Sequence, residues 1–151
     1  MSDVRIKYWK IAPEGVSKLR ELEHYLNVDS GLDHTLLELV RLRASLLNGC
    51  KYCIEVHTAQ LQKMNETSER IAVAEWRSSQ AYTKRERAAL SWTEVVTNIQ
   101  DGHAPDVVYE EVRAVFSEVE TVDLTLTIST INAWNRLAIA LGAHSGREVR
   151  S

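Results

Sequence analysis

The sequence is short of the residues that make turns. Its 151 residues include two prolines, six glycines and a single phenylalanine. Proline and glycine interrupt helices and shape tight turns, so their scarcity favours long helices over a turn-rich β fold. A chain of this length is typical of one domain. We therefore expect an all-α, single-domain protein, a helical bundle with a core over about residues 12–142 and short tails at both ends.

The sequence also lacks the features of membrane and nucleic-acid proteins. No stretch approaches the ~20 apolar residues of a membrane span, and the first ten residues, MSDVRIKYWK, contain no apolar segment of a signal peptide. The net charge of -3 gives no basic excess for nucleic acid. These absences predict a cytoplasmic protein with neither a membrane nor a nucleic acid as partner.

Apolar residues recur at helical spacing along most of the chain. A segment near the C-terminus, VDLTLTIST, instead alternates apolar and polar residues, which is typical of a strand. A lone strand would have no partner, so we predict one long helix there, followed by a frayed tail after Gly142. The predicted helices span residues 13–26, 33–47, 50–64, 67–74, 83–99, 105–115 and 121–141.

The chain has only two cysteines, and both lie in one short segment, LNGCKYCIEVHTAQ. On a helix with ~100° per residue, Cys50, Cys53 and His57 fall within about 60° of one another. Apolar residues share this face, whereas Lys51 and Glu55 do not. The two thiols and the imidazole are therefore expected to face the protein interior together.

Four kinds of site could use this pair of cysteines. A structural disulfide over so short a loop stabilises little and is rare in the cytosol. A structural zinc needs four ligands, but the sequence has no second ligand pair. Attachment of a c-type haem needs histidine where Ile54 stands. A redox-active dithiol fits better: Cys50 would begin a helix, whose N-terminus favours a thiolate, and His57 could accept a proton. We expect no metal and no bound cofactor.

Glu38 is the carboxylate that could orient His57. It is the only acidic residue between Asp33 and the cysteines. It could also be an exposed glutamate paired with Arg41 three residues on, a pair that would stabilise the helix by a few tenths of a kcal/mol. From the residues alone, the second interpretation is favoured.

The segment ELVRLRASLLNGCKYCIEVH resembles the signature of AhpD-like alkylhydroperoxidases, within the carboxymuconolactone decarboxylase superfamily. The signature places a glutamate twelve residues before a CxxC motif, Asn-Gly directly before the first cysteine, and a histidine four residues after the second. Two later segments, TKRERAALSWTEVVTN and INAWNRLAIALG, are also similar to this family. The matching residues are Glu38, Asn48, Gly49, Cys50, Cys53 and His57.

The resemblance implies an all-α fold, a homo-oligomer that is a trimer or hexamer, and reduction of hydroperoxides. It implies that the Cys53 thiolate attacks the peroxide and that Cys50 then resolves the sulfenic acid as a disulfide. An external thiol or dithiol reductant, or a reductant protein, would restore the dithiol. Glu38 and His57 would relay protons, so the resemblance favours a catalytic role for Glu38 over its interpretation as a surface residue.

The match differs from the best-known members at one position, because Tyr52 stands where they have a second histidine before the second cysteine. Related decarboxylases share the fold but generally lack the cysteines, so retention of both argues against decarboxylation. A decarboxylase-like acid–base enzyme using Glu38 and His57, and a redox-sensing oligomer without catalysis, remain the alternatives. Four residues are expected to pack or cap helices rather than line the site: Asn132, Trp134, Asn135 and Arg136.

Overall fold

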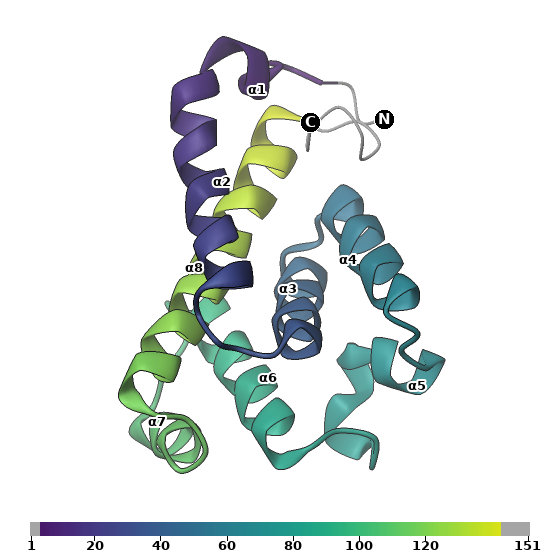
Figure 1. The fold of residues 1–151 in the computed structure, drawn as a ribbon, viewed down its shortest axis with the longest axis vertical. Helices are drawn as coiled ribbons and strands as arrows, with labels where there is room; N and C mark the ends of the chain where they lie inside the picture. The colour runs from purple at the N-terminus through teal and green to yellow at the C-terminus, as the bar shows by residue number, and fades with distance from the viewer. Residues whose placement is uncertain (1–3, 143–151) are drawn as a thin grey trace.

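Helix α3 (His34–Asn48) runs through the middle of the molecule in the computed structural model, which describes residues 4–142 (Figure 1). Three helices pack around it: α4 (Lys51–Lys63), α6 (Lys84–Thr97) and α8 (Glu118–Leu141). No β-strand occurs between residues 4 and 142, so the predicted all-α, single-domain fold is confirmed. The other elements are α1 (Tyr8–Ile11), α2 (Pro13–Val28), α5 (Ser68–Ile71), the 3-10 helix η1 (Val73–Ser78) and α7 (Asp106–Arg113).

The position of α3 follows from its composition. Its apolar residues go nearly all the way round the helix, and a helix of this kind is stable only when it is covered on most sides. One side of α3 packs into a core with α6, α7 and α8, and the other packs against α4, η1 and α6. The buried α3 residues are Leu36, Leu37, Leu39, Val40, Arg41, Leu42, Ala44 and Ser45.

Several predicted helix ends are confirmed in detail. The Asp33 side chain accepts a hydrogen bond from the Leu36 backbone N–H at 3.2 Å and caps α3. Thr83 and Glu86 form a reciprocal capping box at the start of α6. The predicted helix over residues 67–74 is wrong in its extent, because Ala72 has a ψ of 58° and separates α5 from η1.

The segment with alternating apolar and polar residues is helical, as predicted, within the 24-residue helix α8. Threonines in this part of α8 form hydrogen bonds within the helix: the hydroxyls of Thr121, Thr125 and Thr127 donate to the backbone carbonyls four residues earlier. The helix starts three residues before the predicted position, because Ser117 and Glu120 form a capping box. The predicted tail after Gly142 lies outside the described residues.

Helix α1 packs the N-terminal segment against the end of α8. Tyr8 and Trp9 are buried, and the Arg5 backbone N–H donates to the Leu141 carbonyl at 2.7 Å. The chain ends of the described region therefore meet beside the N-terminus of α4 (Figure 1). None of the helices in residues 4–142 combines the length and the apolar composition that a bilayer-spanning helix requires.

Candidate active site

The turn between α3 and α4 sets the position of the first cysteine. Gly49 has a φ of 69°, a left-handed conformation that glycine adopts without strain. The backbone N–H of Cys50 then donates to the Ser45 carbonyl at 3.1 Å, which closes the C-terminus of α3. Cys50 becomes the N-cap of α4, and its Sγ accepts a hydrogen bond from the Cys53 backbone N–H at 3.3 Å.

Asn48 holds this turn against α8. Its side-chain amide donates to Asn132 Oδ1 and to Asn135 Oδ1, each at 2.9 Å. The Asn135 amide in turn donates to the Ser45 hydroxyl at 3.1 Å. Asn132 and Asn135 therefore do the packing and capping that the sequence predicts for them, and they do so at the turn that carries Cys50.

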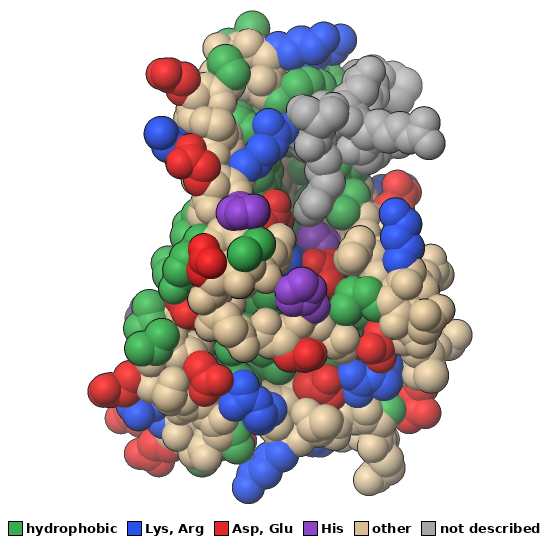
Figure 2. All heavy atoms as spheres, in the orientation of Figure 1, with side chains coloured by type: hydrophobic (Ala, Val, Ile, Leu, Met, Phe, Trp, Pro, Cys, Tyr) green, Lys and Arg blue, Asp and Glu red, His purple; other side chains and the backbone are tan. Residues whose placement is uncertain are grey.

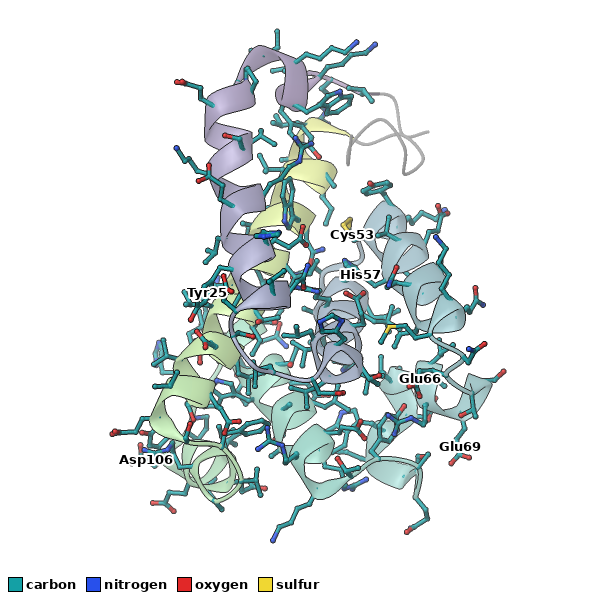
Figure 3. All side chains as sticks on the ribbon, in the orientation of Figure 1. Tyr25, Cys53, His57, Glu66, Glu69 and Asp106 are labelled. Carbon is teal, nitrogen blue, oxygen red and sulfur yellow. A yellow bond between two sulfur atoms is a disulfide. The ribbon has the colours of Figure 1, made fainter. Side chains whose placement is uncertain are left out.

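The two cysteines form a disulfide in the protein interior. Cys50 is 2% exposed, and Cys53 and His57 are each 3% exposed. The prediction that all three groups face inward is confirmed, and Figure 3 shows Cys53 and His57 on the side of α4 that faces α2, α3 and α8. The sulfurs lie in an apolar cluster that also contains Tyr8, Trp9, Val16 and Ala138.

Glu38 joins His57 and Arg41 in one buried network. His57 Nδ1 lies 2.8 Å from Glu38 Oε1, and Arg41 Nη1 donates to Glu38 Oε2 at 2.8 Å. Pairing with Arg41 and orientation of His57 were alternatives for Glu38 at the level of sequence, but the carboxylate binds both residues. The expectation that a Glu38–Arg41 pair would be exposed is wrong: the side chains are 12% and 4% exposed, because α3 is covered on most sides.

The charge state of Glu38 decides the role of His57. Burial alone would raise the pKa of the Glu38 carboxyl, but the hydrogen bond and charge of His57 and the charge of Arg41 outweigh it and lower the pKa to about 2. The carboxylate is therefore ionised near neutral pH and only accepts hydrogen bonds. His57 Nδ1 therefore donates to Glu38, and in the neutral imidazole with this tautomer Nε2 is the nitrogen that can accept a proton from another group.

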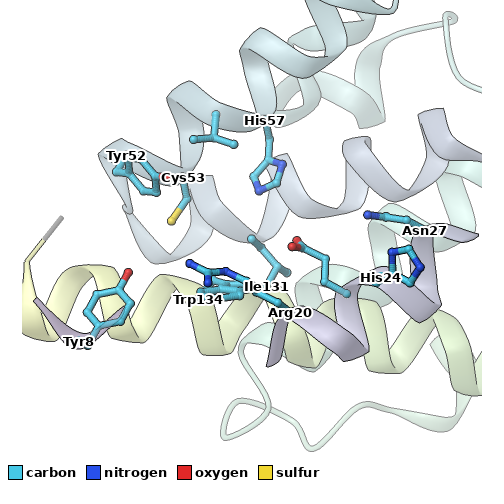
Figure 4. Close-up of a pocket in the computed structure, with 11 residues that line it drawn as sticks. Tyr8, Arg20, His24, Asn27, Tyr52, Cys53, His57, Ile131 and Trp134 are labelled. Atoms are coloured by element: carbon cyan, nitrogen blue, oxygen red, sulfur yellow. The ribbon is translucent and has the colours of Figure 1, made fainter. Parts of the chain in front are cut away.

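A pocket of about 240 Å³ opens onto Cys53 and His57 (Figure 4). Cys53 lines this pocket, whereas Cys50 does not. A small molecule that enters the pocket would therefore meet Cys53 and the imidazole together. The lining residues are Tyr8, Arg20, Glu23, His24, Asn27, Tyr52, Cys53, Val56, His57, Ile131 and Trp134.

A second pocket, of about 300 Å³, shares Asn27, Val56 and His57 with the first and is more polar. Glu38 and Arg41 line this second pocket, and they do not line the first. His57 therefore borders both the pocket that contains Cys53 and a pocket through which water can reach Glu38.

The structure adds residues that sequence reasoning missed. Tyr8 lies in a segment that the sequence analysis assigned to a tail, and Trp134 was expected to pack rather than to line the pocket. His24 is far from the cysteines in sequence but lines the same pocket. The only sequence signal for Tyr8 was the pair of aromatic residues at 8 and 9 in a polar N-terminal segment.

Across residues 4–142, no group of three or more His, Cys, Asp or Glu side chains is arranged to hold a metal ion.

A helical domain with a buried CxxC disulfide, a neighbouring histidine and a shared carboxylate matches the AhpD-like class of thiol proteins. The carboxymuconolactone decarboxylase family matches residues 12–95, a segment that contains all six residues of the signature. The chain belongs to this family, as the sequence resemblance indicated.

Similar proteins support the same assignment. The uncharacterized protein YdfG of Bacillus subtilis (strain 168) is 40% identical over 139 residues, which cover 91% of this chain and 94% of YdfG. The structure of ATU0492 from Agrobacterium tumefaciens is 38% identical with a TM-score of 0.90, and covers 95% of this chain and 99% of that one. ATU0492 is a protein of unknown function for which a role as the antioxidant defence protein AhpD has been suggested.

A more distant structure with the same fold is that of a debrominase. A variant of the debrominase Bmp8 in complex with 2,3,4-tribromopyrrole has a TM-score of 0.78 and is 17% identical, with coverage of 93% of this chain and 75% of that one. At this identity the likeness shows the fold alone. The reaction of the present chain has to be argued from its own residues.

Proposed function

We propose that the protein is a thiol-dependent peroxidase that reduces hydroperoxides with the Cys50–Cys53 pair. The observation that carries this proposal is that Cys53 and His57 line one pocket, with the ionised Glu38 bound to the far side of the imidazole. A reactive thiol needs an adjacent base, and the base needs a group that orients it. The antioxidant role suggested for ATU0492 agrees with this reaction class.

The reaction begins with the reduced dithiol. His57 Nε2 takes the Cys53 proton, and the thiolate attacks the terminal oxygen of a hydroperoxide, ROOH. The O–O bond breaks as the S–O bond forms, so Cys53 becomes a sulfenic acid and the RO⁻ leaving group receives the proton from His57 as ROH. The Cys50 thiol then attacks the Cys53 sulfur, which forms the disulfide and releases water. Two electrons pass from the dithiol to the peroxide.

The disulfide is returned to the dithiol by an external reductant. Two reductant thiols, or one dithiol, supply two electrons and two protons and are themselves oxidised to a disulfide. We place this cycle in the cytoplasm, where thiol reductants are maintained and disulfides are transient. The polar pocket lined by Glu38 and Arg41 gives the relay a route to solvent protons.

Cys53 is the attacking residue in this proposal, and Cys50 is the resolving residue. The position of Cys50 at the N-terminus of α4 favours its thiolate electrostatically. Cys53 is nevertheless the sulfur that lines the pocket next to His57. Access to the peroxide therefore supports the same order of reaction that the family resemblance implies.

The direct test is consumption of cumene hydroperoxide with dithiothreitol as reductant. We expect turnover by the wild-type protein and none by Cys53→Ser or Cys50→Ser. A single equivalent of peroxide should leave a sulfenic acid on Cys53 in Cys50→Ser, detected by mass spectrometry after trapping with dimedone. The same trap should find no sulfenic acid on Cys50 in Cys53→Ser.

A matched pair of histidine variants tests the relay. His57→Asn should lower kcat/KM by about 100-fold or more, the range expected for loss of a general base. His103→Asn, the same exchange at an exposed histidine, should leave it unchanged. Turnover of a lactone by the variant without cysteines would favour the decarboxylase-like alternative. Stoichiometric disulfide formation without turnover would favour the redox sensor.

A further inference from the structure

Two hydrogen-bond donors beside Cys53 have no acceptor. Within the described part of the chain, only three buried side-chain nitrogen or oxygen atoms lack a hydrogen-bond partner. They are Tyr8 Oη, Trp134 Nε1 and Arg41 Nη2. Buried polar atoms are nearly always satisfied, because a donor removed from water without an acceptor costs about 1–3 kcal/mol. Unsatisfied donors at the walls of a pocket are therefore groups that a bound molecule can satisfy.

Two of these donors belong to the pocket that contains Cys53. Tyr8 and Trp134 both line it, and in Figure 4 the Tyr8 hydroxyl points to the side of the pocket where the Cys53 sulfur lies. Tyr8 is also a member of the apolar cluster around the disulfide, and Trp134 packs against that cluster. A molecule that reacts with Cys53 would thus come within reach of both donors.

Both groups are neutral donors at physiological pH. The indole N–H of tryptophan has no acceptor capacity at all. Burial, together with the nearby Tyr52 phenol, outweighs the charge of Arg20 and raises the pKa of Tyr8 to about 12. An atom that binds both donors is therefore an acceptor, and a neutral or partly negative oxygen meets this requirement.

We propose that the Tyr8 hydroxyl and the Trp134 indole N–H bind the leaving oxygen of an organic hydroperoxide while Cys53 attacks its terminal oxygen. The inference rests on the proposed peroxidase activity and names the two groups that hold the substrate oxygen. Negative charge develops on the leaving oxygen as the O–O bond breaks, and donors that are already in place stabilise this charge most. Tyr8 and Trp134 keep their protons, and the alkoxide takes its proton from His57.

One wall of the pocket fits an organic group rather than a second hydroxyl. Tyr52, Val56 and Ile131 form this wall with the two aromatic donors, and the polar part of the lining comes from Arg20, Glu23, His24 and Asn27. Hydrogen peroxide would leave this apolar wall in contact with water, whereas an aryl or alkyl substituent would cover it. The structure therefore favours a compact aromatic or branched hydroperoxide, of which cumene hydroperoxide is a suitable probe.

The test observes the tryptophan indole N–H groups directly. In ¹⁵N-labelled protein with Cys50→Ser and Cys53→Ser, cumene hydroperoxide can bind without reacting. We expect the Trp134 indole N–H signal, assigned by its loss in Trp134→Phe, to shift downfield on titration. The indole signals of Trp76 and Trp92 should stay in place, because these groups already donate to Glu94 and Thr125.

Two further variants complete the test. In the serine background, Tyr8→Phe should weaken binding of cumene hydroperoxide by about fivefold or more, consistent with the loss of one hydrogen bond. In the protein with both cysteines, Tyr8→Phe should lower kcat/KM by about 10–100-fold, as expected for the loss of one donor to a developing oxyanion. Tyr109→Phe, the same exchange at an exposed tyrosine, should change neither quantity.

The possible results separate the inference from the function on which it rests. A Trp134 signal that does not move, in a protein that does reduce cumene hydroperoxide, overturns the inference and leaves the peroxidase proposal standing. A specific shift at Trp134 without any turnover supports the oxygen-binding site and rejects peroxidase activity. Equal shifts at all the tryptophans, or unchanged binding in Tyr8→Phe, also overturn the inference.

Discussion

At the scale of single residues, Glu38 is the group on which the proposed relay depends. Its two carboxylate oxygens bind His57 on one side and Arg41 on the other, both at 2.8 Å. Arg41 places a permanent positive charge beside the buried carboxylate, and the carboxylate orients the imidazole through Nδ1. Tyr8 and Trp134 would provide donors at the other end of the reaction, where charge leaves the peroxide.

The lowered pKa of Glu38 makes a prediction about stability and pH. The folded-state pKa is about 2 and the ordinary value is 4.5. Between these values the unfolded chain binds the proton and the folded protein does not, so the group stabilises the protein above about pH 4.5. This contribution, on the order of 3 kcal/mol, is lost as the pH falls towards 2.

Glu38→Gln should remove this contribution. The variant leaves Arg41 without a buried counter-charge, and we expect it to be less stable at pH 7 by about 3 kcal/mol in urea unfolding. Its stability should also depend less on pH than that of the wild type between about pH 4.5 and pH 3. Glu21→Gln, at an exposed glutamate paired with Lys18, should keep the wild-type pH dependence. Identical pH dependence in all three proteins would contradict the assignment.

At the scale of helices, the turn between α3 and α4 positions the site. It ends the central helix, places Cys50 at the N-cap of the next one, and is anchored to α8 through Asn48. The rotation of α4 about its axis then determines that Cys53 and His57 point inward. A small change in this turn would therefore act on every group of the site.

Two glycine variants should have opposite effects on stability. An added Cβ meets no atom within 4 Å at either Gly49 or Gly15, so steric contact does not distinguish them. Gly49 has a φ of 69°, and Gly49→Ala should destabilise the protein by about 1 kcal/mol through backbone strain. Gly15 lies in α2, and Gly15→Ala should stabilise it by about 0.5 kcal/mol by restricting the unfolded chain. Urea denaturation of both variants checks the prediction, and effects of the same sign would refute it.

At the scale of the whole molecule, the site is assembled from both ends of the described chain. Tyr8 of α1 and Trp134 of α8 meet the cysteines of α4, and α2 supplies Arg20 and His24 to the same pocket.

The surface has an exposed apolar region: Figure 2 shows hydrophobic side chains gathered over the lower part of α8. Val119 and Val122, three residues apart on this helix, are 66% and 58% exposed.

These exposed valines lead to a prediction about self-association. The resemblance implies a trimer or hexamer, and an apolar helix face is the kind of surface that a second copy covers. We expect light scattering coupled to size-exclusion chromatography to find an oligomer for the wild type and a smaller species for Val122→Glu. Val28→Glu, at an exposed valine near the end of α2, should keep the wild-type mass. A monomeric wild-type protein would contradict the prediction.

Much of the fold was predictable from local patterns. The capping residues Asp33 and Thr83, the break at Gly49 and the shared face of Cys50, Cys53 and His57 depend on residues within one or two helical turns. The helix from residue 121 needed one further argument, that a lone strand has no partner. The errors at Ala72 and at the start of α8 are errors of boundary, where backbone angles and a capping box decide the ends.

What the sequence by itself determined is the set of helices and the inward direction of the two sulfurs and the imidazole, because helical geometry relates neighbouring residues directly. Only the tertiary structure decided which groups meet them. The burial of Arg41 depends on the helices that cover α3, and the meeting of Tyr8 with Trp134 depends on the packing of α1 against α8. These contacts join residues far apart in the chain, and their proximity follows from the packing of all the helices together.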